Sequence, residues 1–303
     1  MKHTLITYIH TIMKVVLVCT GVFQEYILHN IKNLILHGNT DITLITELMF
    51  FPMIQEHPEF RDVKLVATSD LSSEMIKHFD QTSTLDRVFR GGFWYHCSSR
   101  FFYIYEYMKK NNIKDIVHIE NDTMVYTNLD TLKDGFTVDK VYAPFDTFTR
   151  VIPSFVFIPS HHALKPIIDK YDGTKTDMDN LASIEHVEPL PIISVEDNLH
   201  FFNKHFAAFE ALFDAAAFGQ YVGGIDKRND PNDTRGFVNE TCFFKYDRYP
   251  FYWIRDKKNN LWCPWIEIGG KLVKIVNLHL HGKMLHEFMS DNPIECQYIK
   301  ILS

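Results

Sequence analysis

Two carboxylates one residue apart follow a short apolar stretch near the middle of the chain. Residues 115–126 read Asp-Ile-Val-His-Ile-Glu-Asn-Asp-Thr-Met-Val-Tyr, so Glu120 and Asp122 come where a predicted strand leaves its sheet. Because side chains alternate along a strand, His118 is expected on the same side as both carboxylates. Carboxylates this close repel each other unless a cation or a proton lies between them. The pair therefore predicts a site for magnesium or manganese, ions that prefer oxygen ligands and also bind substrate phosphates.

A second polar pattern, near the C-terminus, bears on the same site. Residues 274–283 read Lys-Ile-Val-Asn-Leu-His-Leu-His-Gly-Lys, and as one strand they place His279, His281 and Lys283 on one face. An imidazole can complete a metal site begun by Asp122, and Lys283 can neutralise a phosphate as a point charge. Acid pairs at strand ends and polar strand faces are each common on protein surfaces. Their combination favours a site for a metal and a diphosphate, with Asp122 as its leading ligand.

The apolar pattern indicates the elements that should position these residues. Short strands are expected at 15–18, 42–45, 63–67, 116–119, 141–143, 154–158, 251–254 and 272–280. Helices are expected at 25–37, 98–112, 161–171 and 199–218. Strands and helices alternate in the first part of the chain, which predicts an α/β fold with a mainly parallel sheet covered on both faces.

The composition is typical of a globular protein, with 46% apolar and 23% charged residues among 303. A net charge of −7 and the absence of a lysine-arginine run argue against a nucleic-acid partner, which requires a basic face. The five cysteines are widely spaced and include no Cys-x-x-Cys pair. This usage favours reduced thiols in a cytoplasmic protein over a disulfide framework or a zinc ribbon.

The stretch from Thr4 to Cys19 is apolar, but a tyrosine, a histidine and a lysine interrupt it. It falls short of the roughly 20 apolar residues that span a bilayer, and no small-residue cleavage site stands out. We therefore expect no transmembrane segment, a loosely attached leader at residues 1–13 and a single domain at residues 14–303.

The chain resembles the nucleotide-sugar-dependent glycosyltransferases of the GT-A fold, over most of residues 14–287. That family carries an Asp-x-Asp or Glu-x-Asp motif after a central strand and a C-terminal histidine that joins the same metal. Residues 120–122 are similar to the first motif, and residues 279–282, His-Leu-His-Gly, resemble the His-x-x-Gly of one retaining branch. The resemblance implies a Rossmann-like central sheet, with a nucleotide-sugar-binding half at 14–130 and a smaller mixed acceptor half at 131–303.

The resemblance also implies roles for single residues. Asp122 and His279 would ligate manganese or magnesium, Glu120 would bind ribose or the metal, and Lys283 would contact the diphosphate. His281 is the alternative to His279 as a ligand, because the lysine does not follow at the spacing of the retaining branch. The implied partners are a nucleotide-sugar donor, with a UDP-sugar favoured, and a glycan or glycoconjugate acceptor. The oligomeric state is left open.

Four further residues are candidates for substrate binding or catalysis. Arg100, on the helix before the motif, and Thr20, directly after the first strand, are implied as donor-binding residues, although a helix-surface arginine is an equally good interpretation of Arg100. In an inverting reaction a carboxylate takes the proton of the acceptor hydroxyl, and Glu240 and Asp226 in the glycine-rich region are the candidates. A retaining reaction needs no such base.

Other classes of protein fit parts of this pattern. A nucleotidyltransferase of similar fold should carry a glycine-rich basic loop after the first strand, but residues 19–25 contain one glycine and no lysine or arginine. A metal hydrolase lacks support from a His-Glu-x-x-His or Gly-x-x-x-x-Gly-Lys motif. A non-catalytic carbohydrate-binding or nucleotide-sugar-binding protein of the same fold is the alternative that the sequence leaves open.

Overall fold

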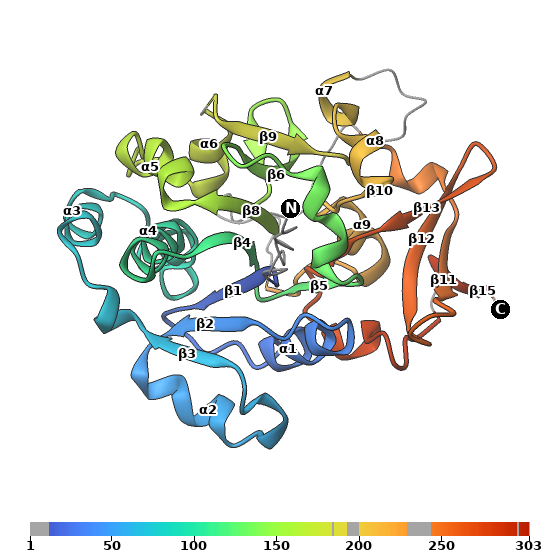
Figure 1. Cartoon of the computed structure of the whole chain (residues 1–303), viewed down its shortest axis with the longest axis horizontal. Helices are drawn as coiled ribbons and strands as arrows, with labels where there is room; N and C mark the ends of the chain where they lie inside the picture. Colours follow the sequence, from blue (N-terminus) through green and yellow to red (C-terminus); the bar gives the residue numbers. More distant parts are fainter. Residues whose placement is uncertain (1–11, 184, 193–199, 229–243, 296, 303) are drawn as a thin grey trace, which may run out of the picture.

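A central sheet organises the molecule, as Figure 1 shows for the computed structural model of the chain. The structure describes residues 12–183, 185–192, 200–228, 244–295 and 297–302. In this part of the chain the central sheet has eight strands in the order β3-β2-β1-β4-β8-β6-β7, and the eighth, β9, pairs with β6. Their bounds are β1 (Lys14–Cys19), β2 (Ile42–Thr46), β3 (Lys64–Ala67), β4 (Lys114–Ile119), β6 (Val141–Thr147), β7 (Arg150–Val151), β8 (Phe155–Ser160) and β9 (Val187–Leu190).

The first four of these strands along the chain run parallel to one another. β1 pairs in parallel with β2 on one side and with β4 on the other, and β2 pairs in parallel with β3. β8 is antiparallel to both β4 and β6, whereas β9 is parallel to β6. The chain therefore leaves β1 in one direction and returns to its other side at β4, which makes the carboxyl ends of β1 and β4 a topological switch point. The predicted fold class, α/β with a mainly parallel central sheet flanked by helices, is confirmed.

Helices cover both faces of this sheet. Val16 of β1 lies in the core with α4 (Phe93–Asn111), whereas the next residue, Leu17, lies in the core with Ile31 of α1 (Ile27–Leu36). This alternation is what a strand buried on both faces requires. The other helices in the first two thirds of the chain are α2 (Phe51–Gln55), α3 (Glu74–Thr82), α5 (His161–Asp169) and α6 (Asp177–Ala182), of which α3 and α5 pack against α4.

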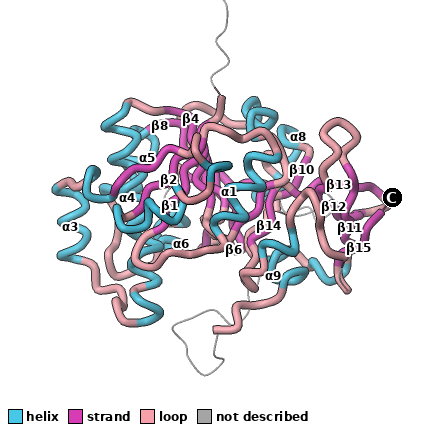
Figure 2. Tube along the Cα trace, turned by 90° about the horizontal axis from the view of Figure 1, so that it is seen from below, coloured by secondary structure: helices cyan, strands magenta, loops and turns pink. Residues whose placement is uncertain are grey.

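A second sheet lies beside the central one, at the C-terminal side of the chain (Figures 1 and 2). It contains β10 (Ala211–Leu212), β11 (Phe251–Arg255), β12 (Trp262–Ile268), β13 (Lys271–Ile275) and β15 (Ile299–Leu302), in the order β10-β13-β12-β11-β15. A small antiparallel ladder of β5 (Thr123–Val125) and β14 (Asn277–His279) connects the two regions, because β5 follows β4 and β14 follows β13.

Short helices complete the described chain. The α-helices after β9 are α7 (His200–Asn203), α8 (Phe206–Phe209) and α9 (Ala217–Gly223). The 3-10 helices are η1 (Leu48–Phe50), η2 (Pro58–Phe60), η3 (Thr68–Leu71), η4 (Phe89–Gly91), η5 (Leu129–Gly135), η7 (Tyr246–Arg248) and η8 (Leu285–Phe288). Among the described residues, no helix has both the length and the apolar character needed to cross a bilayer.

Two predicted elements in the C-terminal half were wrong. The described part of the predicted helix at 199–218 is broken, because Glu210 and Ala216 adopt φ angles of 49° and 66° and β10 pairs with β13 between them. The single strand predicted at 272–280 is two strands in different sheets, β13 and β14. At the break, the N–H of Val276 donates to Leu212 and its carbonyl accepts from Tyr126, so this residue joins the two sheets.

The boundaries of two other predictions differ from the structure. The helix predicted at 98–112 begins at Phe93, directly after Gly92 with its φ of 86°. Of the predicted leader, residues 1–11 lie outside the described residues. Met13 is buried and its N–H donates to the Asp130 carboxylate at 2.7 Å, so the core already begins there.

A buried histidine at the end of α1 should make the protein sensitive to mild acid. Burial, helped by the charge of Lys274, lowers the pKa of His37 from 6.5 to about 4, and its Nε2 lies 2.7 Å from Ser290 Oγ. Between pH 6.5 and pH 4 the unfolded chain binds this proton and the folded chain does not, so the free energy of unfolding falls as the pH falls. From pH 7 to pH 5 this group should remove about 2 kcal/mol.

Urea unfolding of wild type and His37→Gln at pH 7 and pH 5 measures this contribution. The loss of stability on acidification should be about 2 kcal/mol smaller in the variant, whereas the exposed His162→Gln should follow wild type. Equal losses in all three proteins would show that His37 is not the acid-sensitive group.

Candidate active site

The two carboxylates of the motif lie in a turn at the carboxyl end of β4. The strand ends at Ile119, and the N–H of Thr123 donates to the carbonyl of Glu120 at 3.0 Å to close the turn. Between the two acids, the side-chain amide of Asn121 donates to the carbonyl of Val18, near the end of β1, at 2.9 Å. The turn is thus fastened to the neighbouring strand at the switch point, where ligands of open α/β sheets bind.

The prediction that His118 lies on the same side as these carboxylates was wrong. His118 is still within β4, fully buried, and its Nδ1 hydrogen bonds with the carbonyl of Val16 at 2.9 Å. Alternation of side chains applies only within the strand, and the strand stops before Glu120. His118 therefore belongs to the packing of the sheet rather than to the site.

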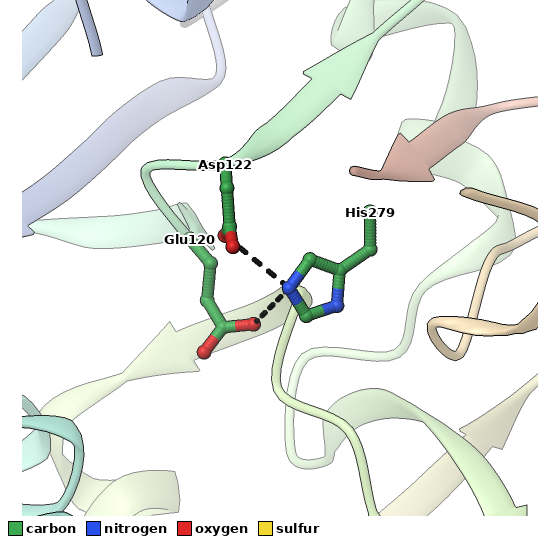
Figure 3. A group of neighbouring side chains, drawn as sticks. All are labelled: Glu120, Asp122 and His279. Atoms are coloured by element: carbon green, nitrogen blue, oxygen red, sulfur yellow. Dashed lines mark ion pairs between the residues drawn. The ribbon is translucent and has the colours of Figure 1, made fainter. Parts of the chain in front are cut away.

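The ladder of β5 and β14 brings the C-terminal histidine to the turn. His279 pairs in register with Thr123, and the N–H of Leu280 donates to the carbonyl of Asp122 at 2.9 Å. Figure 3 shows the consequence: the imidazole of His279 points between the carboxylates of Glu120 and Asp122. Residues half a chain apart in sequence are therefore joined by backbone pairing, not by side-chain contacts alone.

This donor set fits a divalent cation. One ligand atom from each of Glu120, Asp122 and His279 lies within 4.8 Å of the other two. His279 Nε2 lies 3.2 Å from Asp122 Oδ1 and 3.3 Å from Glu120 Oε2. These separations are close to the ~3 Å between adjacent ligands of an octahedral ion with bonds of about 2.1 Å. Glu120 Oε2 is also buried and accepts no hydrogen bond from the described residues, so it can still take a cation.

Positive side chains balance the charges of the two carboxylates. Burial raises the pKa of Asp122, but Lys283 and His279 outweigh this effect and hold it well below its usual value. Burial lowers the pKa of His279, yet Asp122 and Glu120 raise it to about 9. Lys283 Nζ contacts Asp122 Oδ2 directly. Imidazolium and ammonium groups thus occupy the surroundings of the carboxylates, as the repulsion between the two acids requires.

The structure separates the two candidate histidines. His281 lines the same cleft, and its ring centroid lies 4.5 Å from that of His279. Among the described residues, the group whose ligand atoms lie close enough to share one ion contains His279 and does not contain His281. β14 ends at His279, so His281 and Lys283 follow it in a turn, where Lys283 adopts a φ of 61°.

Arg100 lies behind Glu120 rather than on the surface of its helix. Its side chain is buried, with Nη1 at 2.6 Å from Glu120 Oε1 and Nη2 in contact with Asp177 Oδ2. Asp177, at the start of α6, is almost fully buried. The sequence did not indicate Asp177, because an acid in the first turn of a helix is an ordinary helix start.

Two of the remaining predicted residues, Thr20 and Asp226, line one cleft. Thr20 lines the cleft beyond β1, with Oγ1 at 3.0 Å from His96 Nδ1. Asp226 lines it beyond α9 and is paired with two guanidinium groups, at 2.7 Å from Arg228 and 3.6 Å from Arg90. Glu240 lies outside the described residues. Sequence reasoning missed both arginines, because neither belongs to a motif.

The cleft runs from the end of β1, past the carboxylates, to the segment after α9. Its lining includes aromatic residues as well as the charged groups: Tyr26, Phe93 and Trp94. The cleft thus combines cationic side chains, a cluster of carboxylates and histidine, and flat apolar surfaces. Such a lining suits a ligand with a charged end and a ring-containing body.

Comparison with known proteins gives similarity at the level of the fold. No protein-family model matches the chain, and no curated protein matches its sequence. Mouse xyloside xylosyltransferase 1 is similar with a TM-score of 0.40 and 12% identity over 67% of this chain and 94% of its own. The glycosyltransferase GlyE of Streptococcus pneumoniae TIGR4 has a TM-score of 0.39 and 15% identity over 59% of this chain.

A cytidylyltransferase from Leptospira borgpetersenii serovar Hardjo-bovis is also similar, with a TM-score of 0.32 and 11% identity over 53% of this chain and 65% of its own. The matched region spans less than half of the GlyE chain, at 45%. The first two of these three proteins are glycosyltransferases, the kind of enzyme that the sequence resembles. At these identities and TM-scores the likeness describes the fold and says nothing about the activity of this chain.

Proposed function

We propose that the protein is a glycosyltransferase that moves a sugar from a nucleoside-diphosphate sugar to a hydroxyl group of a glycan or glycoconjugate. The observation that carries this proposal is the meeting of Glu120, Asp122 and His279 at the switch point of the sheet, inside a cleft with cationic walls. Carboxylate and imidazole ligands with room for phosphate oxygens suit manganese or magnesium. A UDP-sugar is the favoured donor.

The proposed roles follow from charge and position. When bound, the metal would withdraw charge from the departing diphosphate. Lys283 would move from Asp122 to a phosphate oxygen, and Arg100 would fix the direction of the Glu120 carboxylate. Asp226 or Glu240 would take the proton of the acceptor hydroxyl in an inverting reaction. The Asp226 carboxylate is held by Arg228 and Arg90, so it can act as a base only after those contacts change.

A panel of nucleotide sugars tests this proposal. Thermal unfolding with uridine and guanosine diphosphate sugars, with and without manganese, should give a large stabilisation for the donor, because stabilisation grows with ligand concentration over Kd. Nucleoside diphosphate release with that donor then measures turnover. Binding without turnover on any acceptor would favour a non-catalytic nucleotide-sugar-binding protein of the same fold, and no binding of any of these sugars would contradict the proposed transferase.

Removal of the Lys283 charge should weaken the product complex. Lys283→Met is expected to raise the Kd of uridine diphosphate by 10-fold to 100-fold, since a hydrogen bond to a charged group is worth about 1.5–3 kcal/mol. Lys283→Arg should retain most of the affinity. Lys32→Met is a matched control, because Lys32 is an exposed lysine that pairs with Asp291 outside the cleft. Isothermal titration with manganese present measures all three variants, and an unchanged Kd for Lys283→Met would remove Lys283 from the diphosphate site.

A further inference from the structure

A buried carboxylate without a role in the proposed chemistry lies directly behind His279. Asp214 comes between β10 and α9, and its side chain has no exposed surface. Its Oδ1 accepts from the N–H of Phe218 at 2.8 Å, and its Oδ2 accepts from the N–H of Gly219 at 2.7 Å and of His279 at 2.8 Å. One side chain thus satisfies three backbone donors that would otherwise be buried without partners, at a cost of about 1–3 kcal/mol each.

These three donors belong to two elements. Phe218 and Gly219 lie in the first turn of α9, where N–H groups have no partner within the helix and where the residue at the cap, Ala216, offers no side-chain acceptor. The third donor is the amide of His279 in β14. Asp214 therefore caps α9 and ties the same helix to the strand that carries the histidine.

The histidine strand is held from its other edge as well. The amide N–H of His279 donates to Asp214, and the N–H of the next residue, Leu280, donates to the carbonyl of Asp122 in the motif turn at 2.9 Å. The backbone of His279 is fixed between the carboxylate of Asp214 and the turn. The position of the backbone from which the imidazole side chain extends therefore depends on both contacts.

Gly219 adds an independent steric constraint at the same place. A Cβ atom at Gly219 would lie 2.1 Å from the carbonyl oxygen of His279 and 2.7 Å from its nitrogen, so α9 touches the strand backbone where only glycine fits. Gly223, one turn further, is different. A Cβ atom there would meet the end of the Leu280 side chain at 3.0 Å, which can move.

We propose that Asp214 and Gly219 are positioning residues that set the place of His279 in the metal site. This inference rests on the proposed function, because it assumes that His279 is a metal ligand. Asparagine at position 214 offers one acceptor oxygen in place of two, and its NH2 group would face either the N–H of Phe218 or the N–H groups of both Gly219 and His279. Alanine at position 219 would displace the His279 backbone while leaving every donor and acceptor group in place. Both changes should move the imidazole away from the carboxylates.

Manganese binding to the metal-free protein tests this role apart from catalysis. Electron paramagnetic resonance of free Mn2+, in the presence of saturating uridine diphosphate, gives the Kd of the ion. Asp214→Asn and Gly219→Ala are each expected to raise that Kd by about 10-fold, the lower end of the effect of removing an outer partner of a metal ligand. Gly223→Ala and Asp146→Asn are the controls. Asp146 is also fully buried, but it pairs with Arg150 on a different part of the sheet.

The controls separate positioning from a general loss of stability. Thermal midpoints of Asp214→Asn, Gly219→Ala and Asp146→Asn should fall, whereas manganese affinity should fall only in the two positioning variants. Wild-type affinity in Asp214→Asn and Gly219→Ala would overturn this inference and leave the proposed function intact. Absence of manganese binding to the wild type would overturn both. If Asp214→Asn does not fold, Gly219→Ala decides alone.

Discussion

Replacement of Asp122 by alanine should lower donor turnover by about 10³-fold or more, the largest effect expected of any single change in this protein. Asp122 contributes one of the three groups that meet in the proposed metal site and also pairs with Lys283. Its loss removes a charged ligand from the metal that stabilises the leaving diphosphate, an effect of several kcal/mol on the barrier. Manganese-dependent release of nucleoside diphosphate from the active donor measures the change.

Two further variants show whether charge or shape is responsible. Asp122→Asn keeps the shape of the side chain and removes its charge, so it should be nearly as inactive as Asp122→Ala. Asp139→Ala changes an exposed aspartate in a loop and should behave as wild type. Turnover within a few-fold of wild type in Asp122→Ala, with the fold intact by circular dichroism, would contradict the proposed metal site and with it the transferase mechanism.

The parts of the site that the sequence predicted are those that local patterns encode. β4 is an apolar stretch that stops on Glu120, so the position of the turn follows from the pattern. The polar residues around His279 interrupt an apolar segment, which marked them as unusual. The sequence did not show that the carboxylates and His279 lie next to each other. In the structure the antiparallel pairing of β5 with β14 brings them together.

The residues that the sequence could not predict are positioned by distant backbone contacts. Asp214 has three partners, two of which could belong to any helix start, whereas the third, His279, lies 65 residues away. Val276 joins two sheets through contacts to Leu212 and Tyr126 that no periodicity records. For the same reason the strand at 272–280 was predicted as continuous, because what changes at Val276 is the set of pairing partners.

The buried position of Arg100 leads to the second large prediction, a loss of stability. Removal of one partner from a buried ion pair leaves a charge without compensation and costs about 3–5 kcal/mol. Arg100→Leu leaves the almost fully buried Asp177 without its partner and leaves Glu120 with His279, at 3.3 Å, so a loss within that range is expected. Urea unfolding at pH 7 measures it. If Arg100 were a helix-surface arginine, the loss would be below about 1 kcal/mol.

A matched control and a compensating change make this prediction specific. Arg87→Leu breaks an ion pair with Asp80 of similar length, 2.9 Å, but both of its side chains are about half exposed, so it should cost no more than about 1 kcal/mol. Asp177→Asn added to Arg100→Leu removes the uncompensated charge on Asp177 and should restore part of the lost stability. No recovery in the double variant would show that the cost comes from packing around the guanidinium group. Recovery would show that Arg100 stabilises the fold by compensating the charge of Asp177, next to the Glu120 of the proposed metal site.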